Sequence, residues 1–487
     1  MKINYLIPKA VPIEINSRML PREDQIQAFK DLSQWGTASD YSQVGTGKSL
    51  VSYLRMIAAL TEGSGVLVVM PPPLIPQYIS KLYQFVPGFP YRVAVFDENR
   101  AKRHKVMDGW DIRGWPDVLV ISYAMFLKYF PGLSRIRKYR SIICDEAHIL
   151  SNFTNKTFER MFSFVWSREA SLLLMTATPA ITEINAAYGH IRLKDPKAYS
   201  SYAQFERMHI DYEKIRLNEK VTTKVIVGYR DVATAREHLM KQAIRRLSKD
   251  VLDLQEPTVI SQEVPLSAKH LQIYRKLLLE RMLEYGEHLL VARNQSALRQ
   301  MALQIITNLP EYTQEVIEET PIQTLLVLVD SIDLKSTKLV IFCHFKKTVR
   351  RLAWLLAQYN PALVYGDSDS VSNVARFKED QTCRVLIANY QSGGSGFDLQ
   401  DVCHYGIMYE AIGSPGVMEQ AIGRLHRGGQ TEPVVFWVFR YLKTKSTELI
   451  NKGLTRADQI REVVGDDDCV CDFITHAGRL MIPGELP

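Results

Sequence analysis

The amino-acid sequence predicts an α/β protein with two parallel-sheet lobes and a helical insertion attached to the second lobe. Its 487 residues exceed the usual size of one compact domain, so two or three domains with separate cores are expected. Short runs of Val, Ile and Leu alternate with helical patterns, as the buried strands of parallel sheets do. These runs gather before about residue 180 and after about residue 335, and a long amphipathic stretch separates the two groups.

The expected strands are runs of four to six apolar residues flanked by turn residues. They cover residues 66–70, 118–122, 141–145, 172–176, 338–343, 362–366, 384–389 and 434–439. Most of them are followed by a helical pattern, so each group predicts a parallel sheet covered by helices.

The expected insertion lies at residues 264–310, which are amphipathic and almost free of glycine. They predict two long helices, the first capped by Ser267. The second lobe shows no strong hairpin turn signal with alternating flanks. The expected domains are a first lobe at 1–230, a second lobe at 231–465 with the insertion at about 264–320, and a weakly patterned tail at 466–487.

Composition narrows the function classes. The net charge of +7 is compatible with a polyanionic partner without establishing one. Cys469 and Cys471 lack the two-residue spacer of a zinc knuckle, and the other four cysteines stand singly in or beside apolar runs, as buried thiols do. No apolar run approaches the ~20 residues that span a bilayer, and the N-terminus does not resemble a signal peptide. We expect no membrane partner and a reducing compartment: the cytoplasm of a bacterial or phage-infected cell, or the nucleus of a eukaryote.

A phosphate-binding loop is expected at residues 41–50, YSQVGTGKSL. Glycine lets backbone N–H groups curl around a phosphate, lysine reaches the β and γ oxygens, and a serine hydroxyl holds Mg²⁺. The strict pattern has a further glycine at the position of Ser42. The expected nucleotide ligands in this loop are Gly45, Thr46, Gly47, Lys48 and Ser49, with Ser49 also a metal ligand.

Two acidic residues, Asp145 and Glu146, follow the apolar run of residues 141–144. A carboxylate at a strand end can hold Mg²⁺, and its neighbour can polarise the attacking water. Taken alone, the segment DEAH (145–148) also fits the N-terminus of a helix, where the helix dipole favours acidic residues. With the phosphate loop about a hundred residues upstream, the catalytic interpretation is favoured. Thr176 and Thr178 in MTATP would bridge the nucleotide site to the rest of the lobe, and a threonine-rich turn before proline is the alternative.

Near the end of the chain, QAIGRLHRGGQ (420–430) contains Arg424 and Arg427, three residues apart and so on one face of a helix. No carboxylate lies within five positions after Arg424, so both guanidiniums look unpaired. Phosphoryl transfer needs positive charge where the γ-phosphate gathers negative charge. We expect both arginines to act on the nucleotide from the second lobe, with Gln420 as a polar contact. An exposed basic helix is the alternative.

Together these segments resemble the Swi/Snf-like branch of the superfamily-two helicases over roughly residues 15–455, in a compact form similar to those that bacteriophages encode. LPREDQIQAF (20–29) resembles the adenine-reading glutamine motif, which points to Gln25. Residues 241–257 resemble the double-arginine segment that opens the second lobe, and 390–400 and 420–430 resemble the fifth and sixth motifs. The chain departs from the family in having VGTGKS in the loop and no tryptophan at 409–420.

The resemblance implies two RecA-like lobes and a DNA-dependent ATPase that uses ATP and Mg²⁺ to move along double-stranded DNA. Phosphate contacts are expected at strand ends and helix N-termini, at Ser122, Tyr123, His344, Lys346 and Ser392. A solvated helix face is the alternative for Lys346.

Three other functions stay open at this point. One is a strand-separating helicase, and a second is the motor component of a DNA repair, replication or restriction assembly. The third is a nucleotide-gated clamp without turnover, which the intact Lys48, Asp145, Glu146 and Arg427 disfavour.

Overall fold

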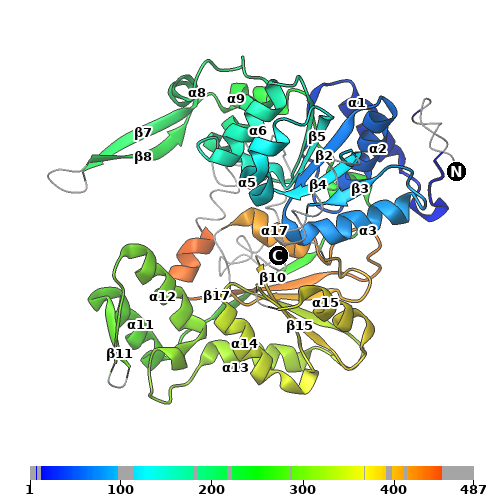
Figure 1. Cartoon of the computed structure of the whole chain (residues 1–487). Helices are drawn as coiled ribbons and strands as arrows, with labels where there is room; N and C mark the ends of the chain where they lie inside the picture. Colours follow the sequence, from blue (N-terminus) through cyan, green and yellow to red (C-terminus); the bar gives the residue numbers. More distant parts are fainter. Residues whose placement is uncertain are drawn as a thin grey trace. The chain divides into compact units, whose positions relative to one another are not determined.

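The computed structural model describes residues 7, 13–96, 114–179, 184–216, 222–285, 288–366, 368–390, 397–410 and 414–451 (Figure 1). The chain divides after Leu252 into two compact units. Each unit is built on its own parallel sheet, so the predicted α/β class with two parallel-sheet lobes is confirmed. No described helix is both long and apolar enough to cross a membrane.

The first unit contains a seven-stranded parallel sheet in the order β3-β4-β2-β5-β6-β1-β9. Its strands are β1 (Thr37–Asp40), β2 (Gly65–Met70), β3 (Val93–Val95), β4 (Val118–Ser122), β5 (Tyr139–Asp145), β6 (Ser171–Met175) and β9 (Ala243–Ile244). Successive side chains of β2 enter different cores: Val66 and Val68 join one cluster, and Leu67 and Val69 join another. The sheet is therefore covered on both faces, as its continuous apolar strands predict.

The helices of the first unit divide between these two faces. The described helices are α1 (Glu23–Ser33), α2 (Lys48–Thr61), α3 (Ile75–Phe85), α5 (Tyr123–Leu133), α6 (Lys156–Trp166), α7 (Ala187–Lys194), α8 (Tyr202–His209), α9 (Val232–Met240) and the short α10 (Ser248–Val251). Side chains of α1, α2 and α3 join the first cluster, and those of α5 and α6 join the second. An antiparallel hairpin, β7 (Ile210–Arg216) and β8 (Thr222–Tyr229), extends beyond α8 (Figure 1).

The second unit contains a six-stranded parallel sheet in the order β10-β17-β16-β13-β15-β14. Its strands are β10 (Thr258–Val264), β13 (Leu339–Cys343), β14 (Ala362–Val364), β15 (Val385–Asn389), β16 (Tyr405–Met408) and β17 (Val435–Tyr441). Outside the helical insertion, the described helices of this unit are α13 (Thr320–Ser331), α14 (Lys346–Leu355), α15 (Ser370–Glu379) and α17 (Pro415–Ile422). Leu339 and Ile341 face one core, and Val340 and Phe342 face the other.

The insertion contains the two predicted helices, α11 (Ala268–Glu280) and α12 (Gln295–Thr307). The Ser267 side chain caps α11 by accepting from the His270 N–H, as predicted. A hairpin, β11 (Met282–Tyr285) and β12 (His288–Val291), separates the helices. This hairpin was not predicted, because the sequence shows no strong turn signal with alternating flanks there. In the sequence, residues 286 and 287 between its strands are Gly and Glu, and a glycine followed by another residue suits a tight turn.

The eight predicted strands are all present, with ends that differ by up to two residues. The short β1, β3, β9 and β16 and the seven-residue β10 were not predicted. Because β9 pairs with β1, the double-arginine segment closes the first unit, and the expectation that it opens the second lobe was wrong. The four described cysteines are buried free thiols, as expected. Cys469, Cys471 and the tail at 466–487 lie outside the described residues.

Candidate nucleotide site

The predicted phosphate loop connects β1 to α2 in the first unit. Gly45 and Gly47 have φ angles of +86° and +87°, which side chains rarely adopt. A Cβ at Gly47 would also lie 2.1 Å from Nε2 of Gln25. Both the backbone conformation and this close approach therefore require glycine at position 47.

Lys48 begins α2 and its ammonium lies over the loop. Its Nζ donates to the carbonyl oxygens of Ser42 at 2.6 Å and Gln43 at 2.9 Å. Gly47, the N-cap residue, provides no side-chain cap for α2. The first-turn N–H groups and the Lys48 ammonium thus lie together at one helix end, an arrangement that suits an anion.

Gln25 links helix α1 to the phosphate loop. Its Oε1 accepts from the Arg22 N–H at 3.0 Å in a capping box, and its Nε2 donates to the Thr46 carbonyl at 3.3 Å. The side chain is buried. The structure therefore places the predicted adenine-reading glutamine directly against the loop, from an element that precedes the sheet.

Asp145 and Glu146 stand at the end of β5. Burial and the neighbouring Glu146 carboxylate raise the pKa of Asp145, and the Lys48 ammonium opposes this shift. Lys48 and Asp145 therefore share one electrostatic environment, as the motif spacing predicts. Glu146 has a φ of +49°, uncommon for a residue with a side chain, and its Oε2 lies 3.1 Å from Nδ1 of His148.

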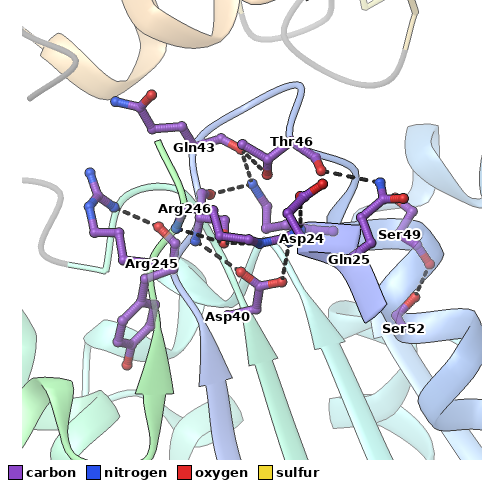
Figure 2. A network of polar contacts seen from close by, with 12 residues as sticks. Asp24, Gln25, Asp40, Gln43, Thr46, Ser49, Ser52, Arg245 and Arg246 are labelled. Carbon is purple, nitrogen blue, oxygen red and sulfur yellow. Dashed lines mark hydrogen bonds and ion pairs between the residues drawn. The ribbon is translucent and has the colours of Figure 1, made fainter. Parts of the chain in front are cut away.

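Arg246 is a residue of this site that the sequence interpretation missed. Its guanidinium contacts the carboxylates of Asp24 at 2.9 Å and Asp40 at 3.1 Å, and the Ser42 hydroxyl at 3.1 Å (Figure 2). The Asp40 side chain is fully buried, so the guanidinium neutralises a carboxylate at the base of the loop.

The residues beside Arg246 add further bonds to the same loop. Arg245 donates to the Tyr41 carbonyl at 2.6 Å (Figure 2). The Ser248 N–H donates to Oε1 of Gln43 at 2.7 Å. The signal for this role was the double arginine in residues 241–257, which we assigned to the other lobe.

Thr176 and Thr178 lie beside the loop in the first unit. The Thr176 N–H donates to the Asp40 carbonyl at 3.1 Å, and the Thr178 N–H donates to the Thr176 hydroxyl at 3.2 Å. Both side chains are buried. The backbone of Thr176 thus contacts the strand that leads into the loop, and the Thr176 hydroxyl accepts within the turn, so the bridging role stays a prediction.

Arg424 and Arg427 belong to the second unit and do not share a helix face. Helix α17 ends at Ile422, and both arginines follow it. Arg427 forms an ion pair with Asp398, and Arg424 donates to the Phe397 carbonyl at 3.3 Å. The interpretation of two unpaired guanidiniums on a helix was therefore wrong, because their partners lie upstream rather than downstream.

Two family models match the chain. A model of the SNF2-related domain matches residues 30–316, and a model of the helicase conserved C-terminal domain matches residues 321–429. The first match covers more than half of the chain. The chain belongs to the SNF2-related family. It is thus a helicase-like ATPase, and the predicted family is confirmed.

Proteins named as ATP-dependent helicases match most of the chain at low identity. An uncharacterized ATP-dependent helicase of Bacillus subtilis is 24% identical over 89% of this chain and 77% of its own length. The ATP-dependent DNA helicase DDM1 of Arabidopsis thaliana is 20% identical over 87% of this chain and 58% of its own. The chain thus spans only part of these larger relatives. A Sulfolobus solfataricus SWI2/SNF2 ATPase core in complex with dsDNA covers 93% of this chain and 98% of its own, at 17% identity and a TM-score of 0.40.

Two of the predicted DNA contacts in this SNF2-related chain are used internally. Ser122 is buried and caps α5 by accepting from the Met125 N–H. Tyr123 is buried, and its hydroxyl donates to the Asp145 carbonyl at 2.9 Å. This placement removes both side chains from the predicted DNA surface, because a buried group bonded inside the unit does not reach a phosphate.

The other predicted contacts lie in the second unit. His344 is half-buried, Lys346 is exposed at the start of α14, and Ser392 lies outside the described residues. Gln420 is half-buried on α17. These assignments stay predictions.

Glu410, which the sequence interpretation missed, holds the turn that presents His344. It is fully buried and accepts from the N–H groups of His344 at 2.7 Å and Phe345 at 2.9 Å. It also accepts from the hydroxyls of Thr307, at the end of α12, and Thr348. Burial raises its pKa, and these four donors oppose the shift. One carboxylate thus ties the insertion to the end of the second sheet.

Proposed function

We propose that the chain couples ATP hydrolysis to movement along double-stranded DNA. The observation that carries this proposal is the loop of residues 41–48 in an SNF2-related chain: its glycines have left-handed backbone angles, and the Lys48 ammonium lies over it and acts on the pKa of Asp145. Membership of the family supports DNA as the partner, and the Arabidopsis relative is named as an ATP-dependent DNA helicase.

In the first unit, the proposed roles follow from the placement of each group. Lys48 would exchange its bonds to two loop carbonyls for bonds to phosphate oxygens, and Gln25 would contact the base. Ser49 and Asp145 would hold Mg²⁺, which neutralises phosphate charge when bound. Their hydroxyl and carboxylate oxygens are the ligands that this ion prefers. Glu146 would orient the attacking water.

In the second unit, Arg427 is proposed to stabilise the charge that develops on the γ-phosphate, assisted by Arg424. Arg427 is ion-paired with Asp398, so its action requires an exchange of Asp398 for the phosphate. Such an exchange makes hydrolysis dependent on a rearrangement within the second unit. Gln420 is proposed as a further contact to the nucleotide.

The direct test is phosphate release by the purified chain with no DNA and with duplex, single-stranded or forked DNA. Stimulation by duplex DNA is expected. Absence of stimulation by every DNA would rule out the proposed coupling, although hydrolysis without DNA would still identify an ATPase.

A second candidate function is strand separation, which the hairpin β11–β12 favours. Met282, Leu289 and Val291 are 40%, 54% and 48% exposed. Met282 pairs with Val291 and Glu284 with Leu289, so these side chains share the outward face, whereas Leu283 is buried. An exposed apolar ribbon of this kind can separate nucleic-acid strands by contacting unstacked bases.

Triplex displacement and strand displacement distinguish the two functions. A duplex translocase removes a third strand and leaves the duplex intact, whereas a helicase separates the duplex itself. The double variant Leu289→Ser/Val291→Ser should keep triplex displacement and DNA-stimulated hydrolysis. If it loses strand displacement that the unmodified chain performs, the hairpin is the separating element.

A further inference from the structure

Helix α7, which none of the predicted motifs includes, lies against the turn that follows Glu146. This turn, η4, covers Ala147–Ser151. A Cβ at Gly189 would lie 2.4 Å from the carbonyl oxygen of Leu150 and 2.6 Å from that of Ser151. The backbone of α7 therefore touches the backbone of η4 at a point where only glycine fits.

The next residue, His190, is fully buried and uses both ring nitrogens. Its Nε2 lies 3.0 Å from the Ala147 carbonyl oxygen, and its Nδ1 lies 3.0 Å from the Tyr41 hydroxyl. A carbonyl can only accept, so Nε2 carries the proton. Burial lowers the pKa of His190 to about 3, so the ring is neutral and Nδ1 accepts from the tyrosine. The two contacts together fix the tautomer.

The two partners of this ring belong to the two halves of the proposed catalytic site. Tyr41 directly precedes Ser42, whose carbonyl accepts from Lys48. Ala147 directly follows Glu146, which has the left-handed φ of +49°. Such a backbone conformation persists only where its surroundings hold it. The imidazole therefore connects the start of the phosphate loop to the strained turn that presents the glutamate.

We propose that His190 is a positioning residue for ATP hydrolysis, whose Nε2–H holds the Ala147 carbonyl and so fixes Glu146 relative to the phosphate loop. This inference rests on the roles proposed above for Lys48 and Glu146. It concerns the hydrolytic step rather than ATP binding, because the binding groups of residues 45–49 do not depend on the Ala147 carbonyl.

Two substitutions at the same position test it in the full chain with duplex DNA. In His190→Gln the amide nitrogen reaches the position of Nε2, and in His190→Asn the shorter amide reaches only the position of Nδ1. His190→Asn should lower kcat roughly ten- to a hundredfold, the scale expected when a catalytic group is misplaced. His190→Gln should restore most of this loss. The Kd of a non-hydrolysable ATP analogue should be the same in both variants and the unmodified chain.

His270 provides the matched control. It is also fully buried, and its Nε2 donates to the Ile305 carbonyl at 2.9 Å, but it belongs to the insertion. His270→Asn should lower the melting temperature without changing kcat of the folded protein. An unchanged kcat in His190→Asn, or equal losses in both His190 variants, would overturn the inference.

If His190→Asn does not fold, Tyr41→Phe removes only the bond between the Tyr41 hydroxyl and Nδ1 of His190. This variant should lower kcat at unchanged ATP affinity, and an unchanged kcat contradicts the proposal.

Glu146→Gln, measured in parallel, separates this inference from the proposed function. Full hydrolysis by Glu146→Gln would show that the assignment of the site is wrong. An inactive Glu146→Gln beside a fully active His190→Asn would overturn the positioning role alone.

Discussion

The two units hold differently the two cations, Lys48 and Arg427, that are proposed to act on phosphate. In the first unit, the Lys48 ammonium lies on carbonyl oxygens of its own loop, and Gln25 and Arg246 bond to the same loop from elsewhere in the unit. In the second unit, Arg427 is held by an oppositely charged partner, Asp398. A carbonyl is a neutral partner that an anion can replace, whereas an ion pair must exchange one negative charge for another. We therefore propose that nucleotide binding depends on the first unit and hydrolysis on a rearrangement in the second.

The largest expected effect follows from removing the cation of the first unit. Lys48→Ala should abolish turnover, chiefly because nucleotide binding weakens when the β and γ oxygens lose their lysine. Equilibrium binding of a fluorescent ATP analogue and steady-state phosphate release measure the two effects separately. Normal binding by this variant would break the assignment of binding to the first unit.

The next effect concerns the second unit. Arg427→Ala should bind ATP normally yet hydrolyse it roughly a thousandfold or more slowly, as loss of an arginine finger typically does. Single-turnover hydrolysis beside equilibrium binding is the measurement. Arg376→Ala is a suitable control, because the half-buried Arg376 bonds to Asn360 and the Pro361 carbonyl in the same unit. Equal loss of binding in Lys48→Ala and Arg427→Ala would remove the contrast between the units.

A smaller effect, on stability, should come from the bridge beneath the phosphate loop. Arg246→Ala leaves the buried Asp40 carboxylate without its cation, which should lower the free energy of unfolding by about 3–5 kcal/mol. The control is Lys241→Ala, which breaks a more exposed ion pair with Asp195 and should lower the free energy of unfolding by about 0–1 kcal/mol. Urea unfolding of Arg246→Ala and Lys241→Ala measures the two losses. Similar losses in both would show that Arg246 is not a buried bridge.

Local patterns predicted the elements and ligands that depend on neighbours in sequence. The loop glycines, Lys48 and the acidic strand end are encoded within short segments, and the Ser267 cap follows from one residue and its successors. The eight apolar runs became strands because short continuous apolar runs favour parallel strands that are buried on both faces.

The features that the sequence did not predict depend on partners that are distant in the chain. Arg427 looked unpaired because Asp398 stands in a different motif, and the helix that was expected to carry it ends at Ile422 before Gly423. Strand β9 has only two residues, too few for an apolar pattern, and it is defined by pairing with β1. The four donors to Glu410 come from two distant segments, Thr307 and residues 344–348. Chain topology, rather than local propensity, creates each of these contacts.

The proposal that matters most is that Lys48 serves nucleotide binding and Arg427 serves the transition state of hydrolysis. The most direct measurement compares the affinity of Arg427→Ala for a non-hydrolysable ATP analogue with its affinity for ADP–aluminium fluoride, which mimics the transferring phosphoryl group. Unchanged affinity is expected for the first ligand and a large loss for the second. Unchanged affinity for both ligands would contradict the proposal, because Arg427 would then have no contact with the developing charge.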